Sequence, residues 1–181
     1  VAGIVSPCRP VPLSIARPEY AYTGVPAPYR FSCHKGTVEE IERIRKAGKV
    51  ARKVLDTVLA EVRPGVSTDE LDGIAHQCAI DHNAYPSPLN YIGFPKSICT
   101  SVNEVVVHGI PDSRILVAGD IINCDVTVYA HGMHADCSDQ ASGKRHAPTE
   151  GAWCLLRPRG REALCANWAT ATCANWRSIS P

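Results

Sequence analysis

Two helical stretches joined by a short loop constrain the fold of this chain more than any other feature. Thr37-Val38-Glu39-Glu40 fits a capping box, in which Thr37 caps a helix and Glu40 reaches back to it. Arg63-Pro64-Gly65 ends that helix, and a second capping box, Ser67-Thr68-Asp69-Glu70, opens another. The apolar positions at helical spacing in the first helix are Ile41, Ile44, Ala47, Ala51, Val54, Leu55, Val58, Leu59 and Val62. Those on one face of the second are Leu71, Ile74, Ala75 and Cys78. The sequence therefore predicts two antiparallel helices joined by a Pro-Gly loop.

From Asn83 onward the pattern changes from helical to strand-like. The stretches 84–88 and 93–96 are loops rich in proline and glycine, and 97–100 and 104–108 are predicted as short strands. Apolar residues then alternate with polar ones, which predicts a strand with one apolar and one polar face. The apolar set is Ile122, Cys124, Val126 and Val128, and the polar set is Asn123, Asp125, Thr127 and Tyr129. Helices followed by strands give a mixed α/β (α+β) fold class.

Asp125 and Asp136 form the sharpest candidate site. If Ala130-His131 is the whole hairpin loop, with Gly132 following, the two aspartates are directly opposed, with Cβ atoms about 4.5–5.5 Å apart. Carboxylates that close repel unless a proton or a cation lies between them, and a pair of metal ions would suit them. Two alternatives stay open. A bulge at Gly132 would shift the register by one residue, or one aspartate merely caps a turn and the two never meet.

Four further residues surround this candidate site in the sequence. His108 follows an apolar run and precedes Gly109-Ile110-Pro111, where it could donate a proton or bind a metal; a hydrogen-bonded histidine at the edge of the core is the alternative. Tyr91, Phe94 and Cys99 are predicted to line a side-chain pocket beside the metals, the alternative being ordinary core packing.

Composition excludes several classes of protein. The net charge of +1 argues against a dedicated nucleic-acid binder, and no apolar run approaches the roughly 18 residues of a membrane span. The nine cysteines include no C-x-x-C pair, and the opening residues show no basic segment followed by an apolar one. We therefore expect reduced thiols, no signal peptide and a cytoplasmic protein.

The two ends of the chain differ in composition from its middle. Residues 1–36 hold six of the 14 prolines, which predicts an extended arm. Residues 139–181 contain no valine, one isoleucine and all three tryptophans, and no period holds there. The sequence thus divides into an arm (1–36), a domain (37–138) and an unassigned tail (139–181), which is either disordered or an out-of-frame translation. A nucleic-acid contact through Arg157–Arg161 with Trp168 and Trp176 is a third hypothesis, against which the net charge argues.

The middle of the chain closely resembles the type I methionine aminopeptidases. The resemblance is carried by the stretches Asn83–Pro88, Gly93–Glu104, His108–Asp112 and Asp120–Val128, in this order. The opening stretches Ser6–Pro12 and Ile15–Tyr20 resemble the proline-rich extension of the actinobacterial branch of that family. The likeness runs from about residue 6 to residue 138, and is weaker at 21–36.

The resemblance implies a pita-bread fold, here its first half only, and removal of the initiator methionine from nascent peptides. It implies two divalent metal ions per site (cobalt, manganese, iron, zinc or nickel), with Asp125 and Asp136 matching the two aspartate ligands. His108 matches the catalytic histidine that contacts the substrate near the scissile bond. Tyr91, Phe94 and Cys99 match residues that line the methionine pocket.

Departures from the family pattern limit what this chain is expected to do. The remaining metal ligands of the family, one histidine and two glutamates, belong to a second half that should follow the Asp136 hairpin, and no later residue is assigned to that role. Asn90, Ala135 and Cys137 stand where the family usually has Gly, Gly and Thr, and Ala135 could crowd the strand beside a ligand. We therefore expect a methionyl aminopeptidase by descent with weak or absent turnover. The alternative is a non-catalytic binding module whose proline-rich arm docks on an SH3-like groove or on the ribosome.

Overall fold

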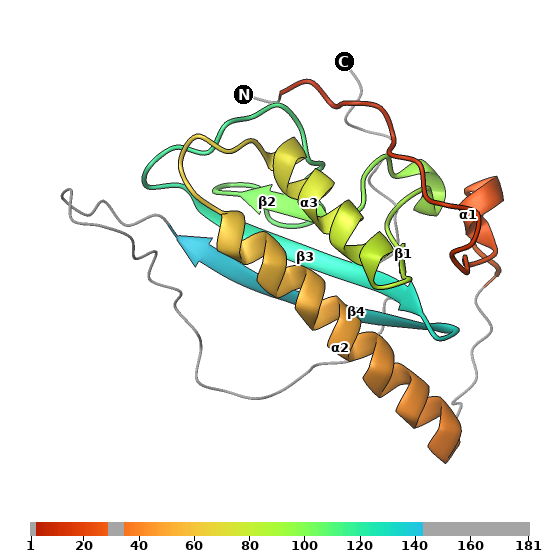
Figure 1. Cartoon of the computed structure of the whole chain (residues 1–181). Helices are drawn as coiled ribbons and strands as arrows, with labels where there is room; N and C mark the ends of the chain where they lie inside the picture. The colour runs from red at the N-terminus through yellow and green to blue at the C-terminus, as the bar shows by residue number, and fades with distance from the viewer. Residues whose placement is uncertain (1–2, 29–34, 143–181) are drawn as a thin grey trace.

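The computed structural model describes residues 3–28 and 35–142 and shows two helices packed on one face of an antiparallel sheet (Figure 1). The helices are α1 (Tyr20–Thr23), α2 (Val38–Glu61) and α3 (Thr68–Asp81), and a short 3-10 helix, η1, spans Tyr91–Gly93. The strands are β1 (Tyr85–Pro86), β2 (Cys99–Val102), β3 (Ile121–Ala130) and β4 (Met133–Ser142). The mixed α/β class expected from the sequence is confirmed.

Both predicted capping boxes are present. In α2 the Thr37 hydroxyl accepts from the Glu40 amide at 3.2 Å, and the Glu40 carboxylate accepts from the Thr37 amide at 2.8 Å. Ser67 and Glu70 make the same reciprocal pair at the start of α3. Each pair satisfies amides that an open helix end would leave without partners, which is why these local signals fix the start of both helices.

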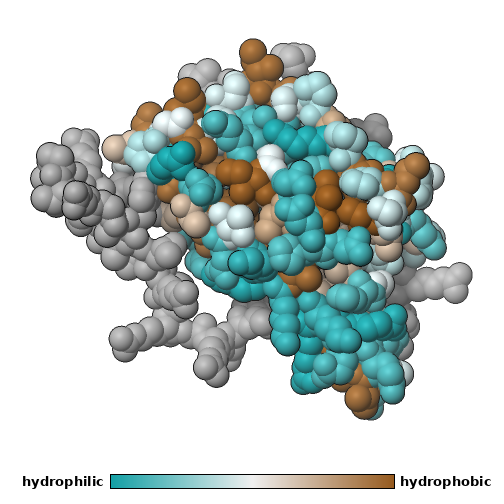
Figure 2. Space-filling model, viewed as in Figure 1, coloured by the Kyte–Doolittle hydropathy of each residue, from teal (hydrophilic) through white to brown (hydrophobic). Residues whose placement is uncertain are grey.

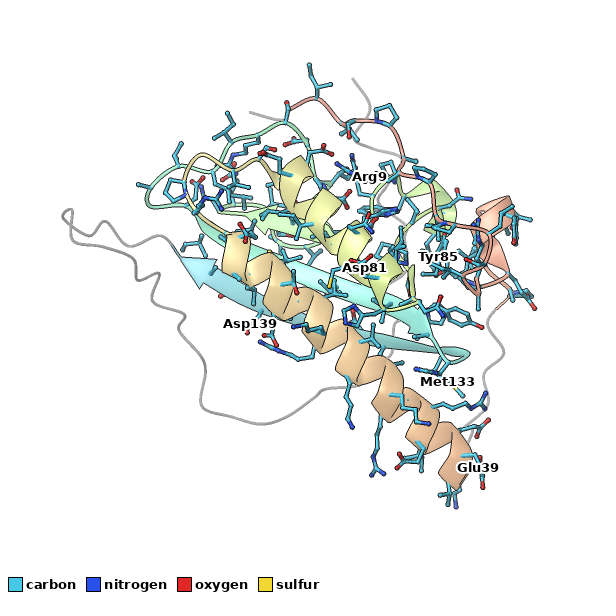
Figure 3. All side chains as sticks on the ribbon, in the orientation of Figure 1. Arg9, Glu39, Asp81, Tyr85, Met133 and Asp139 are labelled. Atoms are coloured by element: carbon cyan, nitrogen blue, oxygen red, sulfur yellow. The ribbon has the colours of Figure 1, made fainter. Side chains whose placement is uncertain are left out.

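The apolar face of α2 is buried only from Ala47 onward. Ile41 and Ile44 are 42% and 39% exposed, although they continue the helical spacing. Figure 3 shows the reason: Glu39, at the start of α2, lies well beyond the hairpin turn marked by Met133, so the first turns project past the sheet. The outward face of α2 is mostly hydrophilic (Figure 2).

Strand β3 is the centre of the sheet. It pairs with β4 along one edge and with β1 and β2 along the other, all antiparallel. The predicted apolar set of β3, from Ile122 to Val128, is buried in the core cluster with α2 and α3. The alternation predicted for this strand is confirmed, so its polar set faces away from both helices.

The strand predicted at 104–108 is wrong, and that predicted at 97–100 lies slightly later, as β2. Val105, Val106 and Val107 lie in an exposed irregular loop. The outer edge of β2 is occupied by Gly109 instead, whose carbonyl accepts from the Thr100 amide at 2.9 Å. Tertiary pairing by a single glycine therefore overrides the β-propensity of three consecutive valines.

The N-terminal arm lies against the domain. Apart from α1 it has no helix or strand within residues 3–28, and it passes over α3 (Figure 1). Ile15 and Tyr20 are buried, and Tyr20 donates to the Ser87 carbonyl at 2.6 Å. At the other end of the described chain, β4 continues to Ser142, past the point where the sequence analysis placed the start of the tail. The hypotheses about the tail concern residues 143–181, which lie outside the described residues. Within residues 3–28 and 35–142, no helix is long and apolar enough to cross a membrane.

Candidate metal centre

The hairpin that carries the two aspartates turns one position later than predicted. Ala130 pairs with Met133, so the loop is His131-Gly132, and both residues have positive φ, 55° and 75°. Two-residue hairpin loops favour this geometry because its twist matches that of the flanking strands, and glycine fits the second position. Asp136 consequently faces Thr127, and Asp125 faces Ser138. The prediction that the two aspartates are directly opposed is wrong, and so is the alternative of a one-residue shift.

The carboxyl groups nevertheless meet. Asp125 and Asp136 are diagonal neighbours on the face of the sheet away from the helices, and their side chains are hydrogen-bonded to each other. Burial, together with the charge of Asp136 and that hydrogen bond, raises the pKa of Asp125 to about 7. The Thr127 hydroxyl donates to Oδ1 of Asp136 at 2.5 Å, and this bond orients the Asp136 carboxyl group. Carboxyl groups this close repel each other when both are ionised, so the arrangement favours a proton or a cation between them.

Cys99 adjoins this pair. It lies opposite Asp125 in the pairing of β2 with β3, and its side chain is buried. Burial, reinforced by the charges of Asp125 and Asp136, raises the pKa of the Cys99 thiol far above its ordinary value. The thiol is therefore neutral and adds an apolar wall to the site, not a charge.

Tyr91 and Phe94 lie in the segment that leads into Cys99. Phe94 is buried, and the ring of Tyr91 meets that of Tyr20 edge-on, with centroids 5.0 Å apart. Asn90, just before η1, has φ 60°, which explains why glycine would be usual at this position. Asparagine tolerates this left-handed conformation, and its side-chain amide also donates to the Ala21 carbonyl at 3.0 Å.

His108 lies in a loop, not at the end of a strand. It is half-buried with φ 56°, and the following Gly109 pairs with Thr100 at the outer edge of β2. The backbone of β2 thus separates this loop from β3, so the main chain at Gly109 lies about 10 Å from β3, two strand spacings away.

Two histidines, His131 and His134, lie at the hairpin turn. His131 is exposed within the turn itself. His134 lies on the face of Asp136, two residues away, and its Nδ1 is 2.8 Å from the Ser87 hydroxyl. Its ring also stacks on Tyr20 and contacts Tyr129. The structure therefore gives His134 a packing and hydrogen-bonding role at the end of the sheet.

Two substitutions relative to the usual family pattern leave the aspartate face clear. Ala135 and Cys137 flank Asp136 in β4, and both are packed against the core cluster on the opposite face of the strand. Ala135 therefore lies on the face of β4 away from the carboxyl groups, because adjacent strand residues point to opposite faces.

The sequence analysis did not identify a group of charged residues that lies on α3 and on the segment before β2. Asp72 and Lys96 are each 1% exposed, and they belong to one network with Asp69 and with Arg9 of the arm. The sequence held one signal: Asp72 is adjacent to Leu71 and one helical turn from Ala75, both members of the predicted apolar face. Buried charges of this kind require partners, but only the fold shows which residues supply them.

Taken as donors for a divalent cation, the described residues supply part of a site. Two carboxylates in contact are oxygen ligands of the right charge and spacing for a shared cation. No group of three or more His, Cys, Asp and Glu side chains that could hold a metal ion occurs within residues 3–28 and 35–142. The fold and this carboxylate pair define a two-layer α/β hairpin scaffold that carries a partial acidic cation site on the sheet face away from its two helices.

Comparison with known proteins gives the family. The profile of metallopeptidase family M24 matches residues 42–150, and the chain belongs to that family. A Mycobacterium tuberculosis protein named methionine aminopeptidase 2 is 54% identical over 135 residues, which cover 74% of this chain and 47% of that protein. Methionine aminopeptidase 1 of Schizosaccharomyces pombe is 49% identical over 140 residues, 75% of this chain and 37% of its own length.

Solved structures agree. The crystal structure of methionine aminopeptidase from Rickettsia prowazekii superposes with a TM-score of 0.60 and 46% identity, covering 62% of this chain and 45% of that one. That from Thermotoga maritima gives 0.59 and 29%, covering 61% and 45%. The pita-bread fold is therefore confirmed for the part of the chain that aligns. The chain spans less than half the length of these relatives.

Proposed function

We propose that this chain is a methionyl aminopeptidase of the type I class, acting on nascent peptides that begin with methionine, in the cytoplasm. The observation that carries the proposal is the carboxylate pair: Asp125 and Asp136 meet on the open face of β3 and β4, beside the buried Cys99. The relatives named methionine aminopeptidase support the class of substrate.

Asp125 and Asp136 are proposed as two of the ligands of a dinuclear divalent metal centre. When bound, such metals lower the pKa of a water molecule and polarise the carbonyl oxygen of a peptide. The chain's own contribution is to hold both carboxyl groups at one point: Thr127 orients Asp136, and the pairing of β2 with β3 fixes the backbone of Asp125. With no third donor nearby in the described residues, we expect metal to bind weakly.

His108 is proposed to contact the substrate near the scissile bond, where an imidazole can hold or donate a proton. Tyr91, Phe94 and Cys99 are proposed to line the pocket for the methionine side chain. Two of the three are buried, and Cys99 presents a neutral thiol, so together they offer an unbranched thioether chain an apolar surface.

Metal titration of the purified chain tests this proposal. We expect Mn²⁺ or Co²⁺ to give one weak binding event by isothermal calorimetry, lost in both Asp125→Asn and Asp136→Asn. Asp139→Asn is the matched control, because Asp139 lies on the same strand but contacts Arg52 of α2 on the opposite face. Equal binding by wild type and both site variants would contradict the ligand assignment.

A coupled assay on Met-Ala-Ser with the same metals measures turnover, which we expect to be weak or absent. Robust release of methionine would show that the described donors suffice, and the expectation of low activity would then be wrong.

The alternative, a binding module acting through the arm, finds less support in the contacts of the arm. Ser6, Arg9 and Pro10 are all bonded to groups of the domain, and Ile15 is buried. An SH3-like or ribosomal partner would have to displace these contacts first. Capture of a partner by a peptide of residues 1–36, but not by the full chain, would be the expected result if the arm were such a ligand held in reserve.

A further inference from the structure

The segment that leads into the proposed pocket is held by one buried carboxylate. Asp72 of α3 accepts from the amides of Ser97 at 2.6 Å and Ile98 at 3.2 Å. These are the two residues that immediately precede Cys99 at the start of β2. Because Asp72 is 1% exposed, its charge has little access to water and depends on protein partners.

The partner of that charge comes from the N-terminal arm. Arg9 donates through one guanidinium nitrogen to Asp72 at 2.5 Å and through the other to Asp69 at 3.0 Å. Figure 3 shows Arg9 beside α3. A Cβ at Gly73 would lie 3.2–3.4 Å from the guanidinium atoms, so the absence of a side chain there leaves room for Arg9 to lie flat on the helix.

Two further contacts tie the arm to the same segment. Lys96 is 1% exposed; its ammonium donates to the Ser6 hydroxyl at 2.6 Å and pairs with Asp69. His76 lies between the arm and the segment before β2, with Nδ1 2.7 Å from the Ser97 hydroxyl and Nε2 3.0 Å from the Pro10 carbonyl.

The charges in this cluster balance only when the arm is in place. Lys96 and Arg9 are positive, and Asp69 and Asp72 are negative. Without Arg9, one buried negative charge would lack its counter-charge, and Asp72 would have to take up a proton or admit water. Either change weakens an acceptor that now serves two amides.

We propose that Arg9 and Asp72 are positioning residues: the arm, through Arg9, balances the charge of Asp72 and thereby fixes the Ser97–Ile98 backbone that leads into Cys99 of the proposed methionine pocket. The pocket itself rests on the proposed function, but the clamp does not. Arg9 bonds to Asp69 and Asp72, and it reaches the Ser97 and Ile98 amides through Asp72.

Peptide-resolved hydrogen–deuterium exchange on the full chain tests the clamp without requiring activity. In the wild type, the Ser97 and Ile98 amides each donate to the charged Asp72 carboxylate. In Arg9→Gln that acceptor is weakened, so we expect both amides to exchange about tenfold faster or more. Exchange within the buried turns of α2, Ala51–Leu59, should stay unchanged. Arg9→Lys keeps the charge but loses the fork that joins both aspartates, so its effect should be intermediate.

Arg17→Gln is the matched control. Arg17 lies in the same arm and donates to the Val11 carbonyl, away from Asp72. Its substitution should leave the exchange of Ser97 and Ile98 at the wild-type rate.

Thiol labelling gives a second readout. Alkylation of Cys99 should accelerate in Arg9→Gln, while Cys124, buried on the helix side of β3, should not change. Unchanged exchange at Ser97 and Ile98 would overturn the clamp. So would a uniform rise over the whole chain, since Arg9 would then be a general stabiliser. Faster local exchange in a chain that binds no metal would uphold the clamp and reject only the proposed function.

Discussion

Replacing Gly109 by alanine should destabilise the domain and release the loop that carries His108. A Cβ at this position would overlap the Thr100 carbonyl, lying 2.8 Å from its carbon, and would be 3.1 Å from the Cα of Ser101. Carbon atoms in ordinary contact are about 3.5–4.0 Å apart, so the loop must retreat from β2 by roughly 1 Å. These neighbours are backbone atoms of a paired strand and cannot swing aside as a flexible side chain would.

The retreat breaks two hydrogen bonds that join the loop to the sheet. The Thr100 amide donates to the Gly109 carbonyl at 2.9 Å, and the Gly109 amide donates to the Ser101 hydroxyl at 3.2 Å. Thr100 is buried, so its amide would be left without a partner at a cost of about 1–3 kcal/mol. We expect a loss of about 2 kcal/mol, which at an m-value near 2 kcal/mol per molar urea lowers the midpoint by about 1 M.

Gly48→Ala makes the same chemical change with the opposite expected sign. Gly48 lies inside α2, and nothing stands within 4 Å of its potential Cβ. Alanine in a helix interior is favoured over glycine by about 1 kcal/mol, so this midpoint should rise by about 0.5 M. Urea unfolding followed by far-UV circular dichroism measures both variants. Equal midpoints for Gly109→Ala and wild type would refute the steric argument and with it the placement of His108.

Two further predictions concern titration and helix ends. In the metal-free chain, with a chelator present, stability should fall as the pH rises from about 4 to about 7: burial and the neighbouring carboxyl raise the pKa of Asp125 to about 7, so the folded state binds more protons than the unfolded one in that window. Urea midpoints across that range should show a shallower decline in Asp125→Asn than in wild type, and parallel curves would contradict the raised pKa. Ser67→Ala should cost about 1 kcal/mol of global stability, since it uncaps a helix that starts within the core. Thr37→Ala should cost clearly less, because the first turns of α2 project beyond the sheet and can fray alone; equal losses in thermal unfolding would show that those turns are part of the cooperative unit.

Local signals predicted the elements whose causes are local. The reciprocal bonds at Thr37 and Ser67 involve residues three positions apart, so the sequence displays both partners together. The loop at 104–108 shows the opposite case. Three valines favour a strand, yet the position on the edge of β2 goes to Gly109, and no property of the valines themselves reveals that competition.

Long-range partners account for most of what the sequence did not show. The bond between Arg9 and Asp72 joins residues 63 positions apart, and that between Asp72 and Ser97 spans 25. Asp69 lies within the capping-box stretch that the sequence displays, but that local pattern could not show that its carboxylate pairs with Lys96. Buried ion pairs are decided by which elements pack together, and packing is a property of the whole fold.

The predicted proximity of Asp125 and Asp136 is correct although the predicted strand register is wrong, because the register error is an even number of residues. The predicted pairing of β3 with β4 was displaced by two residues from the true one, and side chains on a strand alternate with a period of two. Asp125 and Asp136 therefore became diagonal instead of opposed neighbours, but both stayed on the face away from the helices. A displacement of one would have placed Asp136 in the core, where Ala135 and Cys137 now pack against the helices. Burial decides between these two registers. A register that placed the Asp136 carboxylate in the core would lose apolar contacts and bury a charge without a partner. The apolar residues of the hairpin thus determine which residues share the polar face. A substitution such as Cys137→Asp should therefore disturb the carboxylate pair more than any change at the exposed turn residue His131.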